Sequence, residues 1–577
     1  MSDQISVEFD VPAAMRDGVE LRANIFRPAG GGPYPVALVR TPYGKDFSSV
    51  LPVGDALRLA RAGYIVVVQD VRGRFRSGGA WAVFENEASD GYDSVEWAAR
   101  LPGSTGAVGM YGLSYLGFTQ WMAAQSAPPS LRAIVPALTW WDARDGTVGR
   151  GGALELGLQA YWQLNALALD VAVRRTAGQP PAELMRALAG VVNEIDGLRG
   201  EGYGALPLGE FAPLARAGML GDLQAALANA ENPGYFAPYS IRAGYARGQV
   251  PALVVGGWYD IFTGGSLQSF AALRGAGSTP AARQSKLVMG PWSHVNYSNA
   301  VGDLDFGFRA QMALMNLQSD LTGLTVRWFD HWLKGIDNGI AAEPPVRLFV
   351  MGANSWRDEA EWPLARAEAT PFYLRAGGVL SAEPPDDELP DPFVYDPADP
   401  TPTLGGNLLM HALYGPGPRD QRPVEARADV LSYTTPPLDR DTEVTGPLVA
   451  KLWAASDAPD TDFVVRLVDV HPDGFAQNLA DGIVRARYRN GPHAEPLEPG
   501  QPTELTIDLW ATANVFKAGH CIRVDIASAS FPRWDRNLNT GEDPASATAM
   551  RPAQQHILHD AAHPSHILLP IVPRSDD

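Results

Sequence analysis

The sequence predicts an α/β protein with a parallel sheet, a helical insertion and an all-β C-terminal part. Short apolar runs without alternation recur between residues 35 and 290, as in strands that are buried on both faces. Residues 145 to 240 instead place Ala, Leu and Arg at helical spacing. From about residue 345, short strands alternate with turns rich in Pro, Asp and Gly. Because 577 residues exceed the usual size of one domain, we expect two or three domains.

The α/β part begins with a hairpin and continues as alternating strands and helices. Residues 5–13 and 19–26 alternate apolar and polar about Asp17-Gly18, which is typical of an antiparallel hairpin. The buried strands expected next are PVALV (35–39), YIVVVQD (64–70), AVGMYG (107–112), LRAIVPAL (131–138), PALVVGG (251–257) and KLVMG (286–290). Helical patterns from Asp55, from Asp90 and after Ser114 separate several of them. This alternation predicts a doubly wound domain.

Two further regions interrupt and follow this domain. The stretches YWQLNALALDVAVRRT and ELMRALAGVVNEIDGL predict the helices of an insertion that splits the α/β domain. The C-terminal strands expected are PVRLFVMG, GPLVAKLWAAS, DFVVRLVDV, IVRARYR, ELTIDLW and CIRVDIAS. Short strands with regular turn signals predict an all-β sandwich.

Composition excludes several classes of protein. A formal net charge of -19 argues against a nucleic-acid partner, which would require clustered Lys and Arg. No run of 18 apolar residues predicts a membrane span, and the N-terminus lacks an apolar segment followed by a cleavage site. The single cysteine, Cys521, cannot form an internal disulfide and is interpreted as a buried structural thiol. We therefore expect a cytoplasmic protein with no membrane partner.

A candidate nucleophile lies in GLSYLG, residues 112 to 117. Ser114 follows the strand AVGMYG and precedes the helical pattern FTQWMAAQ, which predicts a strand-to-helix turn. The general pattern G-x-S-x-G fails, because Leu116 occupies the place of the second glycine and Gly117 comes one residue late. On this pattern alone, a serine that caps the helix is the alternative to a nucleophile.

A serine nucleophile needs a base that takes its proton. Eight of the ten histidines lie beyond residue 400, in the expected all-β part. His294 follows a strand in KLVMGPWSH, which is where the base of such a site is expected. His331 lies in the amphipathic pattern LTVRWFDHWLKG and is interpreted as a packed or surface residue. His294 is therefore the candidate base.

The base in turn needs a carboxylate that orients it. Asp260 in PALVVGGWYDIFTGG follows a strand end and is the first candidate, with capping of the helix near Ser266 as its alternative role. Its rivals are Asp142 and Asp145, which follow LRAIVPALTWW. Asp70 precedes the serine in the chain and is assigned a structural or arginine-pairing role.

Acyl transfer also needs donors for the negative charge that develops on the carbonyl oxygen. The backbone N–H of Tyr115, the residue after the nucleophile, is one candidate. The early loop RTPYGK lacks an HGGG-type run but offers the Tyr43 hydroxyl as the second. A loop aromatic packed near the surface is the alternative for Tyr43.

Seven motifs, in order along nearly the whole chain, resemble those of a known family. They are TPYGK, VVQDVRGRFRSGG, GLSYLGFTQW, GGWYDIF, GPWSH, RWFDHWLKG and GHCIRVDIASASFPRWDRN. Together they resemble the cocaine esterase family, the serine hydrolases that include Xaa-Pro dipeptidyl peptidases, α-amino acid ester hydrolases and glutaryl acylases. The elbow of that family reads G-x-S-Y-x-G, so Gly117 stands at its second glycine. By length, the cocaine esterase branch is the most similar.

The resemblance implies both roles and architecture. It implies Ser114 as nucleophile, His294 as base and Asp260 as orienting acid, with the Tyr43 hydroxyl and the Tyr115 N–H as oxyanion donors. It also implies an α/β-hydrolase core (1–144 and 241–350), a helical cap (145–240) and a C-terminal jelly-roll β-sandwich (351–577).

The expected substrate is a carboxylic ester with an apolar acyl group. Phe262, Trp162 and Tyr161 are candidate pocket residues, with core packing as the alternative for each; Trp140 and Trp141 are equally ambiguous. No HExxH, cysteine cluster or Asp-rich loop indicates metal catalysis, so no metal and no cofactor are expected. Whether the protein is a monomer or a homodimer is left open.

Two alternatives remain open. One is a Xaa-Pro dipeptidyl peptidase or an α-amino acid ester hydrolase/β-lactam acylase. A peptidase or amino-ester hydrolase would call for carboxylates that hold an α-ammonium group. The acidic candidates near the motifs are Asp142, Asp145, Asp303 and Asp305. The other alternative is a carbohydrate-binding protein on an inactive hydrolase scaffold.

Overall fold

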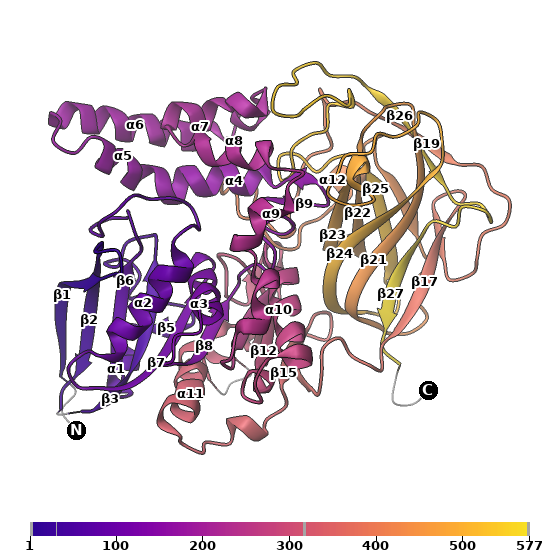
Figure 1. Ribbon diagram of the computed structural model, residues 1–577. Coiled ribbons are helices and arrows are strands. Elements are labelled where there is room, and N and C mark those ends of the chain that lie inside the picture. The colour runs from indigo at the N-terminus through magenta and orange to yellow at the C-terminus, as the bar shows by residue number, and fades with distance from the viewer. Residues whose placement is uncertain (1–3, 31, 316–318, 574–577) are drawn as a thin grey trace.

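The computed structural model describes residues 4–30, 32–315 and 319–573, so the predicted limits at residues 1 and 577 lie outside the described residues. Two large sheets dominate this part of the chain (Figure 1). The first has the strand order β1-β2-β6-β3-β7-β8-β11-β12-β15-β16. Its strands are β1 Ile5–Ala14, β2 Glu20–Pro28, β3 Tyr34–Thr41, β6 Ile65–Asp70, β7 Ser104–Leu113, β8 Leu131–Ala137, β11 Leu253–Tyr259, β12 Lys286–Ser293, β15 Val346–Val350 and β16 Ser355–Glu359.

The middle of this sheet is parallel, as the continuous apolar runs predict. All pairs from β6 through β3, β7, β8, β11 and β12 to β15 are parallel. Every residue of β6 and of β11 is buried, which is why neither strand alternates apolar and polar residues. The expected N-terminal hairpin is the antiparallel pair β1 and β2, with Ala14 opposite Glu20.

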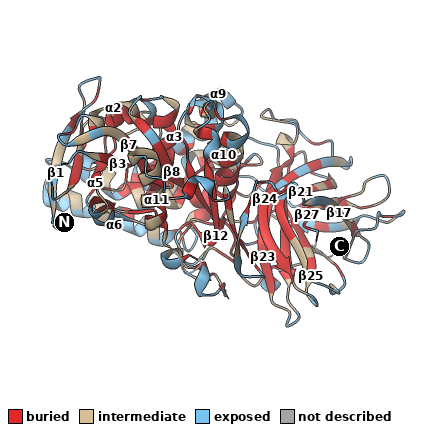
Figure 2. Ribbon diagram, turned by 90° about the horizontal axis from the view of Figure 1, so that it is seen from below, coloured by how far each residue is buried: buried red, intermediate tan, exposed pale blue. Residues whose placement is uncertain are grey.

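Helices connect the strands and pack on the sheet. They are α1 Ala56–Arg61, α2 Glu87–Ala99, α3 Tyr115–Gln125, α10 Thr263–Ala276 and α11 Leu321–Lys334. Asp55 caps α1, because its side chain accepts a hydrogen bond from the Arg58 N–H. In Figure 2 the strands between these helices are coloured as buried. The sheet therefore forms the core that holds the loops at its strand ends.

A helical insertion lies between β8 and β11 and covers the loops at one end of the sheet (Figure 1). Its helices are α4 Leu156–Trp162, α5 Leu169–Arg175, α6 Pro181–Gly197, α7 Ala212–Ala217, α8 Leu220–Ala228 and α9 Pro233–Phe236. A π-helical stretch, Gln163–Ala168, joins α4 to α5 directly after Trp162. Among the described residues, no helix has the length and apolar character needed to span a bilayer.

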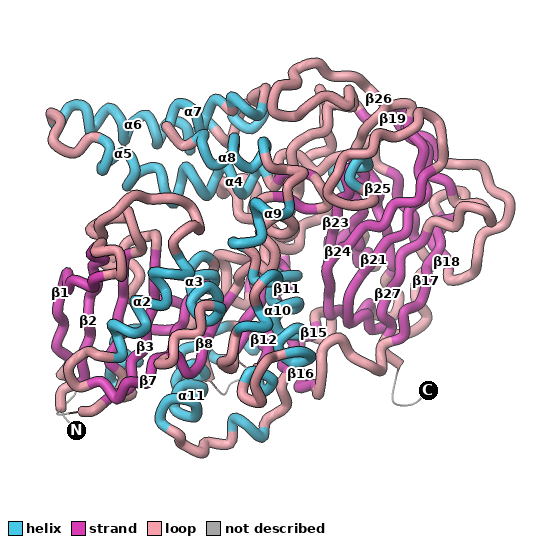
Figure 3. The backbone as a smooth tube through the Cα atoms, in the orientation of Figure 1, coloured by secondary structure: helices cyan, strands magenta, loops and turns pink. Residues whose placement is uncertain are grey.

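In the C-terminal part, the regular secondary structure is almost entirely strands, joined by long loops (Figure 3). Its strands are β17 Glu368–Arg375, β18 Val379–Ser381, β19 Asp391–Tyr395, β20 Leu431–Thr434, β21 Thr442–Ser456, β22 Asp462–Val470, β23 Ala476–Arg485, β24 Thr503–Phe516, β25 Cys521–Ala527, β26 Ala553–Leu558 and β27 His566–Ile571. The short elements are β4 Val50–Leu51, β5 Gly54–Asp55, β9 Gly149–Arg150, β10 Ala153–Leu154, β13 Ala300–Val301, β14 Leu304–Asp305 and α12 Arg422–Glu425.

Three sequence expectations differ from this architecture. The sequence predicts that the strand PVRLFVMG belongs to the all-β part, but β15 pairs with β12 in the first sheet. β16 extends this sheet to Glu359, beyond the predicted boundary at 350. A short strand carries no signal of which sheet it will join. Cys521 is partly exposed rather than buried, because it is the first residue of β25. The small pair β9 and β10 also opens the otherwise helical insertion.

Candidate active site

Ser114 lies on a tight turn between β7 and α3. Its backbone has φ 59° and ψ -126°, a conformation that is rare for a residue other than glycine. The turn is fastened to the next strand, because the Ser114 N–H donates to the Ala137 carbonyl over 2.9 Å. Local strain of this kind persists only where the surrounding structure imposes it, and it is typical of functional sites.

The two glycines of GLSYLG are explained by contacts around this turn. Gly112 has φ +140°, and a Cβ at this position would lie 2.6 Å from Cβ of Leu116. A Cβ on Gly117 would lie 2.9 Å from Cβ of Thr139, in the segment after β8. Gly117 therefore allows α3 to pack closely on that segment, and the second glycine is needed there rather than at Leu116.

His294 follows the last residue of β12 and lies between Ser114 and Asp260. Its Nε2 is 3.0 Å from Oγ of Ser114, and its Nδ1 is 2.6 Å from Oδ2 of Asp260. These residues are 180 and 34 positions away from His294 in the sequence. The structure thus brings the predicted nucleophile, base and acid into one line of hydrogen bonds, which is the geometry that nucleophilic catalysis by serine requires.

Asp260 is fully buried after the end of β11. Its Oδ1 accepts the Phe262 N–H over 2.7 Å, so both carboxylate oxygens have partners. Asn407, from the C-terminal part of the chain, donates through Nδ2 to the backbone carbonyls of Asp260 and Trp258, over 2.7 and 3.0 Å. The helix-cap alternative is not what is observed, since α10 begins at Thr263 and Asp260 faces His294.

The rival carboxylates have other partners. Asp142 accepts a hydrogen bond from the Ser240 hydroxyl over 3.1 Å. Asp145 is exposed and accepts the Gly151 N–H over 2.9 Å. Asp260 is therefore the carboxylate that the fold places against the candidate base.

Two further sequence interpretations can be compared with the structure. His331 lies in α11 with its Nδ1 3.3 Å from the Ile336 carbonyl oxygen, in keeping with a surface residue. Asp70 is buried and accepts the backbone N–H of Lys45 over 2.6 Å, so its role is structural.

The Tyr43 hydroxyl also lies at Ser114. It accepts a hydrogen bond from Nε1 of Trp162 over 2.9 Å. Burial raises the pKa of Tyr43 to about 12, and hydrogen bonds with Trp162 and Ser114 oppose this shift. Because the Trp162 N–H supplies a donor to the phenol oxygen, the phenol keeps its own proton for another acceptor. Tyr43 is therefore more than a loop aromatic at the surface.

Tyr115 supplies a backbone N–H at the start of α3. The first N–H groups of a helix have no acceptor within it and carry its partial positive charge. The Tyr115 side chain is anchored separately, because its hydroxyl donates to Oε1 of Glu87 over 3.0 Å. Glu87 pairs in turn with the buried Arg40 at 2.6 Å. This buried network fixes the residue whose N–H is a candidate oxyanion donor.

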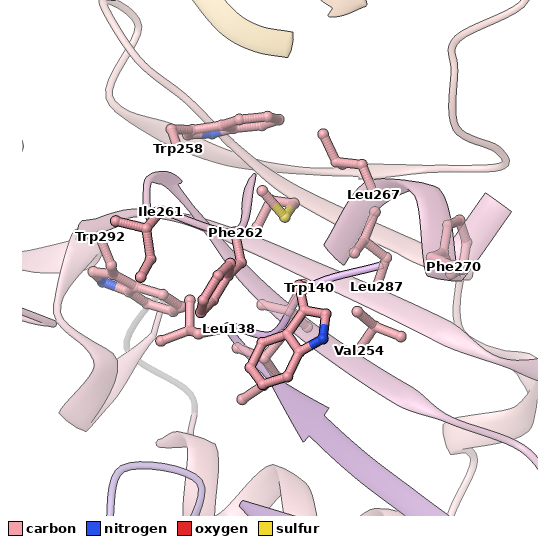
Figure 4. Packing of buried hydrophobic residues seen from close by; sticks show 14 of the residues in the cluster. Leu138, Trp140, Val254, Trp258, Ile261, Phe262, Leu267, Phe270, Leu287 and Trp292 are labelled. Atoms are coloured by element: carbon pink, nitrogen blue, oxygen red, sulfur yellow. The ribbon is translucent and has the colours of Figure 1, made fainter. Parts of the chain in front are cut away.

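A small aromatic cavity adjoins Ser114, with a free volume of about 20 Å³. Its lining includes Phe84, Trp140, Leu158, Trp162, Phe262 and Leu409. Phe84 and Trp162 stack with ring centroids 6.2 Å apart and an interplanar angle of 8°. Figure 4 shows the Phe262 ring directed toward Trp140, at a centroid distance of 5.3 Å. The cavity is therefore small and mostly apolar.

Of the three candidate pocket residues, two line the cavity and one does not. Trp162 and Phe262 line the cavity, whereas Tyr161 packs with the core of the cap. Consecutive helical residues point about 100° apart, and on α4 Trp162 is directed to the cavity while Tyr161 does not line it. Phe84 and Leu409 were missed, because neither lies in a motif and Leu409 comes from the C-terminal part.

The other acidic candidates lie outside this cavity. Asp303 pairs with Arg419, and Asp305 is exposed and accepts the Gly307 N–H over 2.8 Å. Among the described residues that line the cavity, none carries a carboxylate.

Two family models and a known esterase match this chain. The model of the family described as X-Pro dipeptidyl-peptidase (S15 family) matches residues 17–296. The model described as X-Pro dipeptidyl-peptidase C-terminal non-catalytic domain matches residues 338–568. Cocaine esterase from Rhodococcus sp. (strain MB1 Bresler) is 39% identical over 589 aligned residues, which cover 99% of each chain.

Two solved structures are similar over almost their whole length. An aminopeptidase from the marine sediment archaeon Thaumarchaeota archaeon has a TM-score of 0.81 at 26% identity, covering 99% of this chain and 96% of that one. An α-amino acid ester hydrolase has a TM-score of 0.80 at 26% identity, covering 99% of this chain and 98% of that one.

Proposed function

Because the chain belongs to the cocaine esterase-like serine hydrolases of the S15 family, we propose that Ser114, His294 and Asp260 hydrolyse carboxylic esters through an acyl-enzyme. The observation that carries this proposal is the continuous line of hydrogen bonds from Oγ of Ser114 through His294 to Asp260. The Tyr43 hydroxyl and the Tyr115 N–H supply the oxyanion donors.

In the first step, Oγ of Ser114 attacks the ester carbonyl carbon while Nε2 of His294 takes the hydroxyl proton. Asp260 holds the imidazole in the required tautomer through Nδ1 and stabilises the imidazolium that forms. Tyr43 and Tyr115 donate to the carbonyl oxygen as it becomes negative, an interaction of the kind that contributes about 100-fold to 1,000-fold per donor.

Collapse of the tetrahedral intermediate breaks the ester bond. His294 returns its proton to the leaving alkoxide, which departs as an alcohol and leaves the acyl group on Ser114. A water molecule then attacks the acyl-enzyme with His294 again as base, and the acid product and free Ser114 are regenerated.

The cavity supports an ester with an apolar acyl group. Its aromatic lining favours a hydrocarbon or aryl group, and its lack of carboxylates among the described residues gives an α-ammonium group no ionic partner. Since the free volume is only about 20 Å³, binding of such a group requires movement of a lining residue such as Trp162 of the cap or Leu409.

Two variants and one probe test the assignment. Ser114→Ala should lose on the order of a million-fold in kcat for p-nitrophenyl esters. It should not be labelled by a fluorophosphonate that labels the wild type. His331→Ala, which changes a histidine outside the site, should keep its activity. A kcat close to that of the wild type in Ser114→Ala would contradict the nucleophile. An unlabelled wild type would favour the inactive carbohydrate-binding alternative.

The alternative substrates, which are amides or amino acid esters, are tested on the same protein. p-Nitrophenyl esters of apolar acids, amino acid esters, Xaa-Pro amides and β-lactam amides should be compared by kcat/KM. We expect the esters of apolar acids to have the highest kcat/KM. A preference for substrates with a free α-ammonium group would favour the dipeptidyl peptidase or α-amino acid ester hydrolase alternative.

A further inference from the structure

Two histidines and one aspartate gather on the C-terminal sheet, outside the candidate active site. We propose that Asp469, His471 and His520 form a binding site for a divalent transition-metal ion such as Zn²⁺. One possible ligand atom from each of these residues lies within 4.8 Å of those from the other two. The hydrolytic mechanism uses none of them, so the site is independent of the function proposed for Ser114.

Strand pairing brings the cluster together. β22 and β25 are antiparallel, with Val470 opposite Cys521 at the end of the ladder. His471 and His520 lie directly beyond this last pair, and their ring centroids are 4.4 Å apart. Alternate strand residues share a face, so Asp469 lies on the same face as His471, whereas Cys521 lies on the opposite face.

The aspartate is already fixed by its neighbours. Oδ1 of Asp469 is 2.7 Å from Nδ1 of His520, and its Oδ2 accepts Nδ2–H of Asn514 over 3.1 Å. Asp469 is only 2% exposed, while both histidines are partly exposed at the turns that end their strands. A buried, oriented carboxylate beneath two accessible imidazoles leaves an ion a route from solvent.

A glutamine orients one of the imidazoles. Nε2 of Gln477 donates to the Tyr259 hydroxyl over 3.1 Å, so its Oε1 is free to accept. That oxygen lies 3.3 Å from Nε2 of His471, which must be the donor. The neutral ring then carries its lone pair on Nδ1. Outer contacts that fix a tautomer in this way accompany most metal-binding histidines.

The set of donors matches the chemistry of Zn²⁺. Two imidazoles and one carboxylate, with a fourth place for water, are a common set of zinc ligands, and oxygen-preferring Ca²⁺ is disfavoured. Bond lengths of about 2.0–2.2 Å in a tetrahedron separate ligand atoms by roughly 3.4 Å. From a spread of at most 4.8 Å, small side-chain rotations suffice to reach this separation.

No local motif reveals the site, because its ligands come from separate hairpins. Asp469 and His520 are 51 residues apart in the sequence. The spacing therefore matches neither HExxH nor a paired Cys and His pattern.

The test uses the full-length protein without a polyhistidine tag, stripped of metal with EDTA and then dialysed. Titration calorimetry with ZnCl₂ should give one equivalent per chain, and CaCl₂ should give none. His471→Ala and His520→Ala should each lose this equivalent. His563→Ala is the matched control, because His563 also contacts an aspartate, Asp560 at 3.1 Å, but forms no such cluster with other described residues.

A second set of measurements distinguishes loss of the metal site from misfolding of a variant. Wild-type protein loaded with Co²⁺ should show the visible absorption of a low-coordinate site, and Zn²⁺ should displace it. Zn²⁺ should also raise the melting temperature of the wild type and of His563→Ala, but not that of His471→Ala. Absence of a stoichiometric Zn²⁺ equivalent in the wild type, or its retention in His471→Ala, would overturn the proposal and leave a structural Asp–His hydrogen bond.

Discussion

Asn407 donates through Nδ2 to the carbonyl oxygen of Asp260 over 2.7 Å, although 147 residues separate them in the sequence. The same nitrogen lies 3.0 Å from the Trp258 carbonyl and from Oγ1 of Thr263. Asn407 is almost fully buried, so these acceptors have little access to water. A region that matches a family described as a non-catalytic domain thus holds the loop that carries the candidate acid.

We therefore expect Asn407→Asp, which keeps the size but removes the N–H donors, to lower kcat about 10-fold to 100-fold. Small displacements of a catalytic group have effects of this size. KM should change much less, because Asn407 does not line the cavity. Asn490→Asp, at an exposed position, is the control. Steady-state kinetics of the variants measure kcat and KM. An Asn407→Asp enzyme with wild-type kcat would show that Asn407 is not needed to position Asp260.

The Tyr43 hydroxyl gives a second prediction. Tyr43→Phe should lower kcat about 100-fold to 1,000-fold, as expected for loss of one oxyanion donor. Tyr161→Phe should have no effect, because Tyr161 packs in the cap. Titration of kcat against pH supplies an independent check. Since burial raises the pKa of Tyr43 to about 12, its hydroxyl keeps its proton two units beyond the ordinary value of 10.0.

Activity should consequently show no loss near pH 10 that depends on Tyr43. A decline with an apparent pKa near 10 that is present in the wild type and absent in Tyr43→Phe would contradict the assignment.

Local sequence patterns were sufficient for the elements that surround Ser114. The parallel strands are buried on both faces, so their apolar runs predict them directly, and the residues after β7, β11 and β12 follow from where each strand ends. His294 could be chosen over His331 for the same reason. Each of these predictions depends only on the sequence within a few residues of the position that it concerns.

Features that depend on contacts between distant segments could not be predicted. The sequence of β15 predicts a strand, but only its pairing with β12 places it in the first sheet. Asn407 and Leu409 lie in a loop without a motif, and their roles come from packing against β11 and the cavity. The side-chain directions of Tyr161 and Trp162 depend on the rotation of α4 about its axis.

The late glycine of GLSYLG leads to a prediction about stability. Gly117→Ala should lower the free energy of unfolding by about 1–3 kcal/mol, because the new Cβ would lie 2.9 Å from Cβ of Thr139 in a tightly packed region. Gly190→Ala is the matched control, since Gly190 also lies within a helix, α6, but its Cβ would meet nothing within 4 Å. That variant should gain up to about 1 kcal/mol from helix propensity.

Thermal unfolding of both glycine variants provides the measurement. Equal shifts of the melting temperature in Gly117→Ala and Gly190→Ala would show that close packing of α3 does not require a glycine.

Asp70 predicts how stability depends on pH. Burial raises the pKa of this carboxyl from 3.8 to about 6, while hydrogen bonds from the N–H groups of Lys45 and Arg76 act in the opposite direction. The folded protein therefore binds a proton at Asp70 more tightly than the unfolded chain does. Protonation stabilises the fold fully below about pH 4, and this contribution is lost as the pH rises through about 6.

The loss should reach roughly 3 kcal/mol at pH 7, from about two pKa units. Asp70→Asn cannot ionise, so denaturant unfolding should show the wild type losing stability relative to this variant between about pH 4 and pH 7. Asp17→Asn makes the same change in net charge, but the wild type should keep a constant advantage over it above about pH 4 and lose that advantage only at lower pH. The Arg72 hydrogen bond and the Val19 N–H lower the pKa of Asp17, so its ionised form stabilises the fold above the unfolded pKa. Parallel trends in the two variants would mean that net charge, rather than burial of Asp70, sets the pH dependence.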